Sequence, residues 1–355
     1  MEAHQIFCHN SSCQARGRID LDNIVVHQYQ PKKRYRCTEC GTTFVAHKGT
    51  VYEGLRTDEE TVDKVLILMN NGCPPRAIEL AFELDRRTVR DWQSRAGGHC
   101  QGVHQATVGH AQLDLQHVQA DEIRVKTALG AVWMAKAVMV PTRLWLGGCV
   151  SKSRDKSLIQ ELMFQVRACA GRVARPILVC VDGLAAYPKA IRRAFSEKIR
   201  NGKRGRPRLC TWRQLVIGQV VKRYQQLRVI AIETRVAWGC AATCQQLLEQ
   251  SGCQTINTAI IERFNATMRG VIPSLVRRTR GLDRKLATLE HGMFVVGCMY
   301  NFCWRHQTMG GHTPAMADGI TDHQWRVRQL FCYVAPPPLW QPPKRRGRPQ
   351  KAFTP

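Results

Sequence analysis

The chain has 355 residues, which is enough for two or three folding units, and its hydrophobic content of 44% suits globular cores. It carries 53 Lys and Arg against 27 Asp and Glu, so its formal net charge is +26. This excess favours a polyanionic partner such as DNA, because bound Lys and Arg release counterions from phosphates. No apolar run approaches the roughly 18 residues of a spanning helix, and the N-terminus does not resemble a signal peptide. We therefore expect a soluble, cytoplasmic protein without a membrane partner.

The first 54 residues contain two closely spaced cysteine pairs. Most of the 16 cysteines stand singly among apolar residues, which indicates free thiols in a reducing compartment. In contrast, "CHNSSC" and "CTEC" form a C-x4-C and a C-x2-C pair. Two such pairs match the tetrahedral thiolate coordination of Zn²⁺, so residues 1–54 are predicted to be a zinc ribbon with a structural metal. The alternative is four unrelated thiols. The predicted ligands are Cys8, Cys13, Cys37 and Cys40.

Residues 55–100 are predicted to be a helix-turn-helix DNA-binding domain. The segment "PPRAIELAFELDRRTVRDWQSRAG" reads as two short helices broken near residues 84 and 85. Val89 and Trp92 would anchor the second helix in the core. A plain helical linker domain is the alternative, because three-helix units without DNA are common. The residues that this helix would present to DNA are Arg86, Arg87, Thr88 and Arg90.

Residues 113–331 have the pattern of an α/β domain with a mixed sheet. Three strands, a helix, a buried strand and a further helix are expected in that order. Asp121 lies in the first strand and Asp182 ends the buried one, where ligands of α/β sheets usually bind. The expected segments are 113–126, 131–140 and 142–151 for the strands, 156–171 for the helix, 176–183 for the buried strand and 185–195 for the last helix.

A basic insertion is expected at about 200–255, and residues 332–355 form a Pro-rich basic tail. The segments 214–224 and 228–236 are candidate strands of the insertion. An Arg-Gly-Arg-Pro core occurs at Arg206 and again at Arg348. Such a core can lie in the narrow minor groove of A·T-rich DNA. A charged loop at the first site and a solvated tail at the second are equally consistent with the sequence.

The segment "INTAIIERFNATMR" predicts an amphipathic helix that begins near residue 257. Glu262, Asn265 and Arg269 fall on one face, whereas the apolar residues share another. Glu262 could be an ordinary surface carboxylate beside an arginine. However, it accompanies Asp121 and Asp182, and hard divalent cations such as Mg²⁺ prefer carboxylate oxygens. Two such ions can clamp both oxygens of an in-line phosphoryl displacement.

Several motifs together carry a family resemblance. "HVQADEIRVK", "VCVDGLAAYPKAI", "NTAIIERFNATMR" and "YNFCWRHQTMGGHTPAMADGI" resemble the successive signatures of a DDE transposase with a retroviral-integrase-like (RNase H-like) catalytic domain. The predicted zinc ribbon and helix-turn-helix, together with "LVRRTRGLDRK", narrow this resemblance to bacterial insertion-sequence transposases that resemble the insertion-sequence-one family. The resemblance extends to about residue 331.

The resemblance implies a site and a reaction. Asp121, Asp182 and Glu262 would be the metal-binding triad, with two Mg²⁺ or Mn²⁺ ions as cofactors. Arg263 and Asn265 would support Glu262 or touch DNA near the scissile phosphate. The implied reaction cleaves the element ends and joins the freed 3′-hydroxyl to target DNA, without a covalent protein intermediate. Glu122 is a rival ligand that we rank second, because on a strand its side chain faces away from that of Asp121.

Two other functions remain open from the sequence. One is a DNA-binding regulator that has lost catalysis, and the other is an RNase H-like nuclease or resolvase. Under the transposase hypothesis the partners are the terminal repeats and target DNA, and synapsis of two ends requires at least a dimer on DNA. The protein would then be associated with a bacterial nucleoid.

Overall fold

The computed structural model describes residues 6–19, 21–30, 33–128, 130–200, 206–226, 228–276 and 285–342. The chain divides into two compact units. The first comprises Met1–Gly54 together with Val334–Pro355, and the second comprises Leu55–Tyr333. Arg348, in the second Arg-Gly-Arg-Pro core, lies outside the described residues.

The first unit contains a small antiparallel sheet of β1 (Ile24–Gln28), β2 (Arg34–Cys37) and β3 (Thr43–Val45) in that order. A tight turn follows β2, because Gly41 has a φ of 70° and its N–H donates to the carbonyl of Cys37 at 2.9 Å. A positive φ carries no steric cost at glycine. This turn returns Cys40 towards Cys37.

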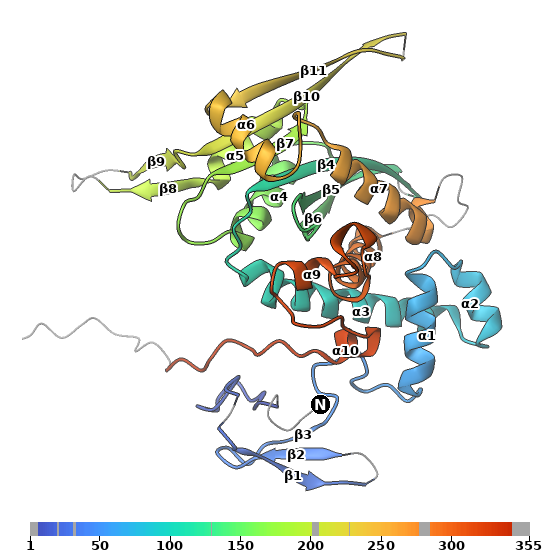
Figure 1. Cartoon of the computed structure of the whole chain (residues 1–355). Coiled ribbons are helices and arrows are strands. Elements are labelled where there is room, and N and C mark those ends of the chain that lie inside the picture. Colours follow the sequence, from blue (N-terminus) through green and yellow to red (C-terminus); the bar gives the residue numbers. More distant parts are fainter. Residues whose placement is uncertain are drawn as a thin grey trace, which may run out of the picture. The chain divides into compact units, whose positions relative to one another are not determined.

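The second unit begins with α1 (Glu59–Met69), α2 (Pro75–Ala81) and α3 (Arg86–Ala106) (Figure 1). The break predicted near residues 84 and 85 is present, and the carboxylate of Asp85 caps α3 by accepting from the N–H of Arg87. The prediction of a short second helix was wrong, since α3 has 21 residues. It continues through Gly97, which packs against the backbone of His291 in α8 (Leu286–Cys298).

The centre of the second unit is a six-stranded sheet with the order β11-β10-β7-β4-β5-β6. Its first three strands in sequence form an antiparallel meander, β7 pairs parallel to β4, β10 pairs parallel to β7, and β11 is antiparallel to β10. The predicted mixed α/β sheet is therefore present. The strands are β4 (His117–Thr127), β5 (Gly130–Met139), β6 (Trp145–Ser151), β7 (Ile177–Asp182), β10 (Leu215–Gln225) and β11 (Arg228–Trp238).

The strands expected within the basic insertion are not separate from the main sheet. β10 pairs along its first half with β7, and β11 extends the sheet by one edge strand. Only β8 (Ser196–Ile199) and β9 (Arg208–Thr211) form a separate two-stranded ribbon. Local apolar patterning indicates strands but not their distant partners, which explains the difference.

Helices cover both faces of the sheet (Figure 1). Side chains alternate between the faces of a strand, and in β4 the side chain of Asp121 meets α7 whereas that of Glu122 meets α5. α5 and α7 therefore lie on opposite faces. The helices that cover the two faces are α4 (Lys156–Cys169), α5 (Ala186–Ala194), α6 (Ala241–Gln250) and α7 (Ala259–Val271).

The remaining elements are short helical segments outside the main sheet. The unit's core is continuous from α3 and α8 into the sheet, because buried Trp145 of β6 packs against Phe294 of α8 and His104 of α3. No helix among the described residues is long and apolar enough to cross a membrane. These elements are η2 (Val108–His110), η3 (Pro273–Leu275), η4 (Met299–Cys303), η5 (Gln307–Met309), α9 (Pro314–Ala317) and α10 (Val327–Cys332).

Candidate functional site

The four predicted zinc ligands come together in the first unit. Their sulfur atoms lie within 4.8 Å of one another, with 3.6 Å between Cys8 and Cys40 and 3.9 Å between Cys13 and Cys37. A tetrahedron of Zn–S bonds of about 2.3 Å has sulfurs about 3.8 Å apart, whereas a disulfide would need about 2 Å. Burial raises the pKa values of the Cys8 and Cys13 thiols, so a bound cation would be needed to favour their thiolate forms. The site therefore suits a structural metal.

Neighbouring parallel strands place Asp121 and Asp182 side by side. In the ladder between β4 and β7, Ala120 is the partner of Val181, so the two aspartates follow matched positions. One carboxylate oxygen each of Asp121, Glu122 and Asp182 lies within 4.8 Å of the others. The sheet thus gathers two of the three predicted ligands at the carboxyl end of the buried strand.

Glu122 is the third member of this group, although we ranked it second as a ligand. Its side chain is fully buried on the face opposite that of Asp121. Its carboxylate accepts a hydrogen bond from the Tyr187 hydroxyl at 2.6 Å and pairs with Arg154. The alternation argument placed its side chain on the correct face. Its carboxylate nevertheless lies within 4.8 Å of those of Asp121 and Asp182, because Asp182 ends β7 and Arg154 contacts both Glu122 and Asp182.

Glu262 does not belong to the group of clustered carboxylates. Its exposed carboxylate pairs with Lys222 of β10 at 3.1 Å and accepts from the Thr258 hydroxyl at 3.0 Å. Its negative charge still acts on Asp121, whose pKa it helps to raise. Glu262 is therefore near the cluster but engaged with another cation.

Asn265 contributes from α7, one turn after Glu262. It is buried, and its side-chain amide donates to Asp121 Oδ2 at 2.7 Å. Asn265 therefore supports Asp121. Among the described residues its side chain makes no hydrogen bond to Glu262, which was one of the two roles expected for it. Its Oδ1 is buried and has no hydrogen-bond partner among the described residues. A buried acceptor beside a carboxylate offers a further oxygen to a hard cation or its water.

Gln119 fixes α7 relative to the aspartates. Its Oε1 accepts from the backbone N–H groups of Ile260 and Ile261 at 2.9 and 3.1 Å, which are unpaired donors of the first helical turn. Gln119 precedes Asp121 by two residues and shares its face of β4. This role of Gln119 was not predicted. The apolar stripe of α7 was predicted correctly, because Ile261, Phe264 and Met268 are all buried.

The carboxylates are held in an environment that disfavours their charge. Burial raises the pKa of Asp121, and the charge of Asp182 raises it further. Burial also raises the pKa of Glu122. Lys136, directly opposite Asp121 in the ladder of β4 and β5, partly offsets this effect although burial lowers its own pKa to about 7. A lysine within the apolar run "VWMAKAVMV" was a detectable sign that we missed.

The donor set fits a hard divalent cation. Carboxylate oxygens, supplemented by an amide oxygen, are the ligands that Mg²⁺ and Mn²⁺ prefer. The orphaned Oδ1 of Asn265 and the raised pKa of Asp121 both indicate a site that a cation would complete. The clustered residues can therefore hold a metal, with Glu262 able to take part only after release from Lys222.

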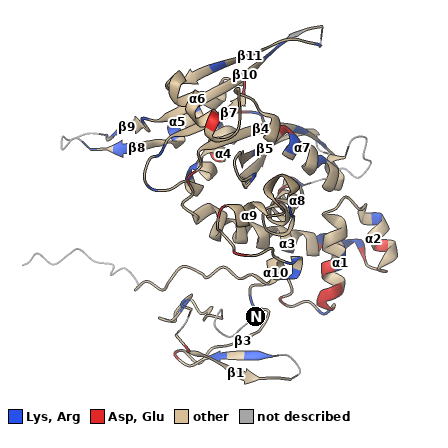
Figure 2. Ribbon diagram, in the orientation of Figure 1, with Lys and Arg blue, Asp and Glu red and all other residues tan. Residues whose placement is uncertain are grey.

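The predicted DNA-contacting side chains are mostly exposed. Arg86 also pairs with Glu79 of α2 at 3.4 Å. Lys and Arg are distributed over many elements of the chain (Figure 2). Thr88 is half-buried, and Asn265 is the exception because its buried amide is engaged with Asp121. The exposed members are Arg86, Arg87, Arg90, Arg206, Arg263 and Arg269.

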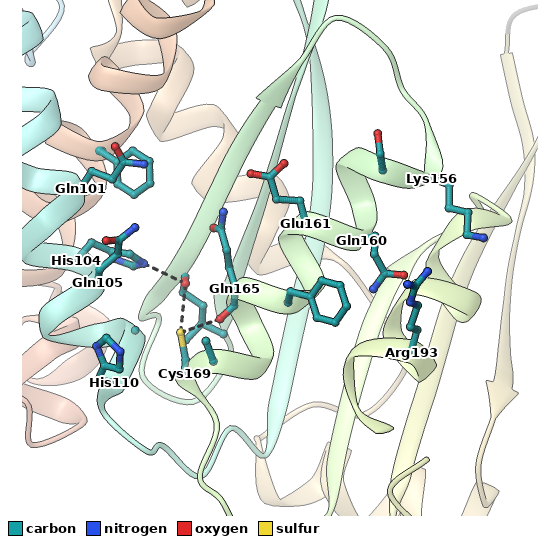
Figure 3. A pocket seen from close by; sticks show the side chains of 16 residues that line it. Gln101, His104, Gln105, His110, Lys156, Gln160, Glu161, Gln165, Cys169 and Arg193 are labelled. Carbon is teal, nitrogen blue, oxygen red and sulfur yellow. Dashed lines mark hydrogen bonds between the residues drawn. The ribbon is translucent and has the colours of Figure 1, made fainter. Parts of the chain in front are cut away.

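A large cavity lies elsewhere in the second unit. It has a volume of about 990 Å³ and opens between α3 and α4, with Leu146 and Phe294 among its apolar walls (Figure 3). His104 lines it and bonds through Nε2 to the Leu146 carbonyl at 3.2 Å. None of the clustered carboxylates lines this cavity. We take the carboxylate cluster as the candidate site, because it brings three carboxylates within 4.8 Å of one another.

No protein-family model matches this sequence, and no curated protein matches it either.

Proposed function

We propose that this protein is a DNA transposase whose second unit is an RNase H-like DDE domain. In this proposal it cleaves the ends of an insertion sequence and joins each freed 3′-hydroxyl to target DNA by metal-dependent phosphoryl transfer. The observation that carries the proposal is the meeting of Asp121 and Asp182 on adjacent parallel strands, with Asn265 of α7 bonded to the first. The resemblance of the sequence motifs adds the reaction class.

The chain's own residues have defined tasks in this proposal. Asp121 and Asp182 hold the cations, Asn265 orients Asp121, and Glu262 completes the ligand set after leaving Lys222. When bound, two Mg²⁺ or Mn²⁺ ions would supply a polarised water and neutralise charge on the phosphate. No Ser, Tyr or Cys side chain is required as a nucleophile.

DNA is the proposed partner, and the net charge of +26 supports it. Exposed arginines at the start of α3 would contact the terminal repeat, and the four clustered cysteines of the first unit would bind Zn²⁺ in a structural role. We place the protein in the bacterial cytoplasm, at the nucleoid, as at least a dimer when two element ends are held together.

One observation favours a second candidate. Because Glu262 is paired with Lys222 outside the carboxylate group, the chain could be a DNA-binding regulator that has lost catalysis. A nuclease or resolvase would also use the cluster but would cut DNA without joining it. The reaction product therefore separates the three functions.

The test is strand transfer by the purified protein with Mg²⁺ on a labelled duplex that carries the element's terminal repeat. Wild type should give joined product, whereas Asp182→Asn and Glu262→Gln should give none. Glu233→Gln is the matched control, since Glu233 is also an exposed carboxylate paired with a cation, Arg223, at 2.9 Å. Cutting without joining would indicate a nuclease, and equal DNA binding without either reaction would indicate a regulator.

A further inference from the structure

A cationic side chain occupies the carboxylate cluster. Arg154 lies in the connection between β6 and α4, outside every motif that suggested a function. Its Nη2 contacts Glu122 Oε1 and also donates to Asp182 Oδ2 at 2.8 Å, so one nitrogen bridges two carboxylates of the group. A bound divalent cation would bridge carboxylate oxygens in the same way.

The rest of the chain holds this guanidinium in place. The Arg154 guanidinium carbon lies 5.0 Å from the centre of the Trp133 ring, at the distance of a cation–π contact. Glu122 is itself fixed by the Tyr187 hydroxyl at 2.6 Å, and both of these side chains are fully buried. Glu122 and Trp133 therefore aim Arg154 at Asp182. The side chain of Arg154 remains 35% exposed, so it can move outward without unfolding the core.

Charge explains why such a residue is needed. Three carboxylates within 4.8 Å of one another repel when no cation is between them, and burial makes this repulsion stronger. Lys136 of β5 lies opposite Asp121, but its side-chain Nζ has no hydrogen-bond partner among the described residues and does not bridge the group. Arg154 is the cation in contact with two members.

We infer that Arg154 is a resident counter-cation of the cluster, which holds Glu122 and Asp182 together without metal and is exchanged at Asp182 for a divalent cation. This inference rests on the proposed function, because it assumes that the cluster binds metal. It assigns Arg154 a positioning role and makes it a competitor of the metal. Glu122 then keeps its bond to Tyr187 and retains the displaced guanidinium, while Asp182 turns to the ion.

The experiment measures Mn²⁺ binding to the full-length protein by electron paramagnetic resonance, without DNA. Arg154→Gln should bind Mn²⁺ about tenfold more tightly than wild type. An opposite charge this close changes the pKa of a carboxylate by about one unit or more, and a metal ion must compete with a charge of that strength. Arg154→Lys keeps the charge but cannot bridge two carboxylates as a planar fork does, so its affinity should lie between the two. Arg175→Gln is the control, since Arg175 pairs with Asp114 at 2.9 Å outside the cluster.

Asp182→Asn separates this inference from the proposed function. If wild type binds Mn²⁺ and Asp182→Asn does not, the cluster is a metal site, and equal or weaker binding by Arg154→Gln then overturns the role of Arg154 alone. If wild type and the Arg154 variants bind no Mn²⁺, both proposals fail. Should Arg154→Gln not fold by circular dichroism, Arg154→Lys decides: tighter binding than wild type supports the exchange, and equal or weaker binding rejects it.

Discussion

Asn265 is a buried residue whose single side-chain hydrogen bond among the described residues sets the position of Asp121. Replacing it by Ala should lower Mn²⁺ affinity and strand transfer by about tenfold, because groups that orient metal ligands typically contribute 10–100-fold. Loss of the bond should also reduce the free energy of unfolding by about 1–3 kcal/mol. Mn²⁺ titration and chemical denaturation measure the two effects.

Thr267→Ala is the matched control for this prediction. Thr267 lies on the same helix, and its hydroxyl bonds only to the Arg263 backbone carbonyl at 3.2 Å. Its substitution should change stability by no more than about 0.5 kcal/mol and leave Mn²⁺ affinity unchanged. Equal losses in both variants would mean that α7 is generally sensitive and that Asn265 has no special role.

His104 makes the stability of the second unit depend on pH. Burial lowers its pKa to about 4, so the folded chain holds it neutral while an unfolded chain would protonate it near 6.5. The unfolded state therefore binds more protons between these values, and stability is lost as the pH falls from about 6.5 to 4. The full loss from this one group is about 3 kcal/mol.

His104→Gln should reduce that pH dependence. Gln has no titrating group and keeps an amide donor for the Leu146 carbonyl, which His104 Nε2 contacts at 3.2 Å. Denaturant unfolding at pH 7 and pH 4.5 should show a smaller difference for the variant than for wild type. The contribution of His117, whose pKa is also lowered to about 4, remains in both proteins. An unchanged slope would show that His104 is not buried in solution.

At the scale of elements, α3 and α8 approach so closely that glycine is required. A Cβ on Gly97 would lie 2.2 Å from the His291 Cβ and 2.5 Å from its Cα, whereas a Cβ on Gly98 meets nothing within 4 Å. Gly97→Ala must therefore push the helices apart and should cost several kcal/mol, by the overpacking mechanism. Gly98→Ala should stabilise the protein by about 0.5–1 kcal/mol, since alanine favours the helix interior.

Each of these two substitutions serves as the control for the other, because both add one methyl group to the same helix. Thermal melting of the two variants measures the difference, which should exceed about 3 kcal/mol in favour of Gly98→Ala. Two variants with similar melting temperatures would contradict the close contact of α3 with α8.

The elements show what local patterns can and cannot predict. Apolar periodicity placed the strands around Asp121 and Asp182 and the buried stripe of α7, because it depends on residues close in sequence. The parallel pairing of β10 with β7 and the length of α3 depend on distant partners. Arg154 lies in a connection without any pattern, and Gln119 lies in a predicted strand, but the roles of both arise only from contacts made in the folded unit.

At the scale of the whole molecule, the structure has two compact units, and the cluster of four cysteines lies entirely in the first. This unit has only short strands, so its fold should depend on metal. The second unit has a six-stranded sheet and an extensive apolar core. Removal of zinc should therefore unfold the first unit selectively.

Chelation of the purified protein should release one Zn²⁺ per chain and abolish the structure of the first unit, because zinc binding at such sites contributes about 10–16 kcal/mol. The thermal transition of the Leu55–Tyr333 unit should move by less than about 2 °C, since none of its residues belongs to the cysteine cluster. Cys37→Ser should reproduce the effect, and Cys210→Ser should retain the metal, because Cys210 is outside the cluster. Atomic absorption measures the metal content, and amide hydrogen exchange follows the structure of the two units separately. Full zinc retention by Cys37→Ser, or joint unfolding of both units on chelation, would refute a separate zinc-dependent first unit.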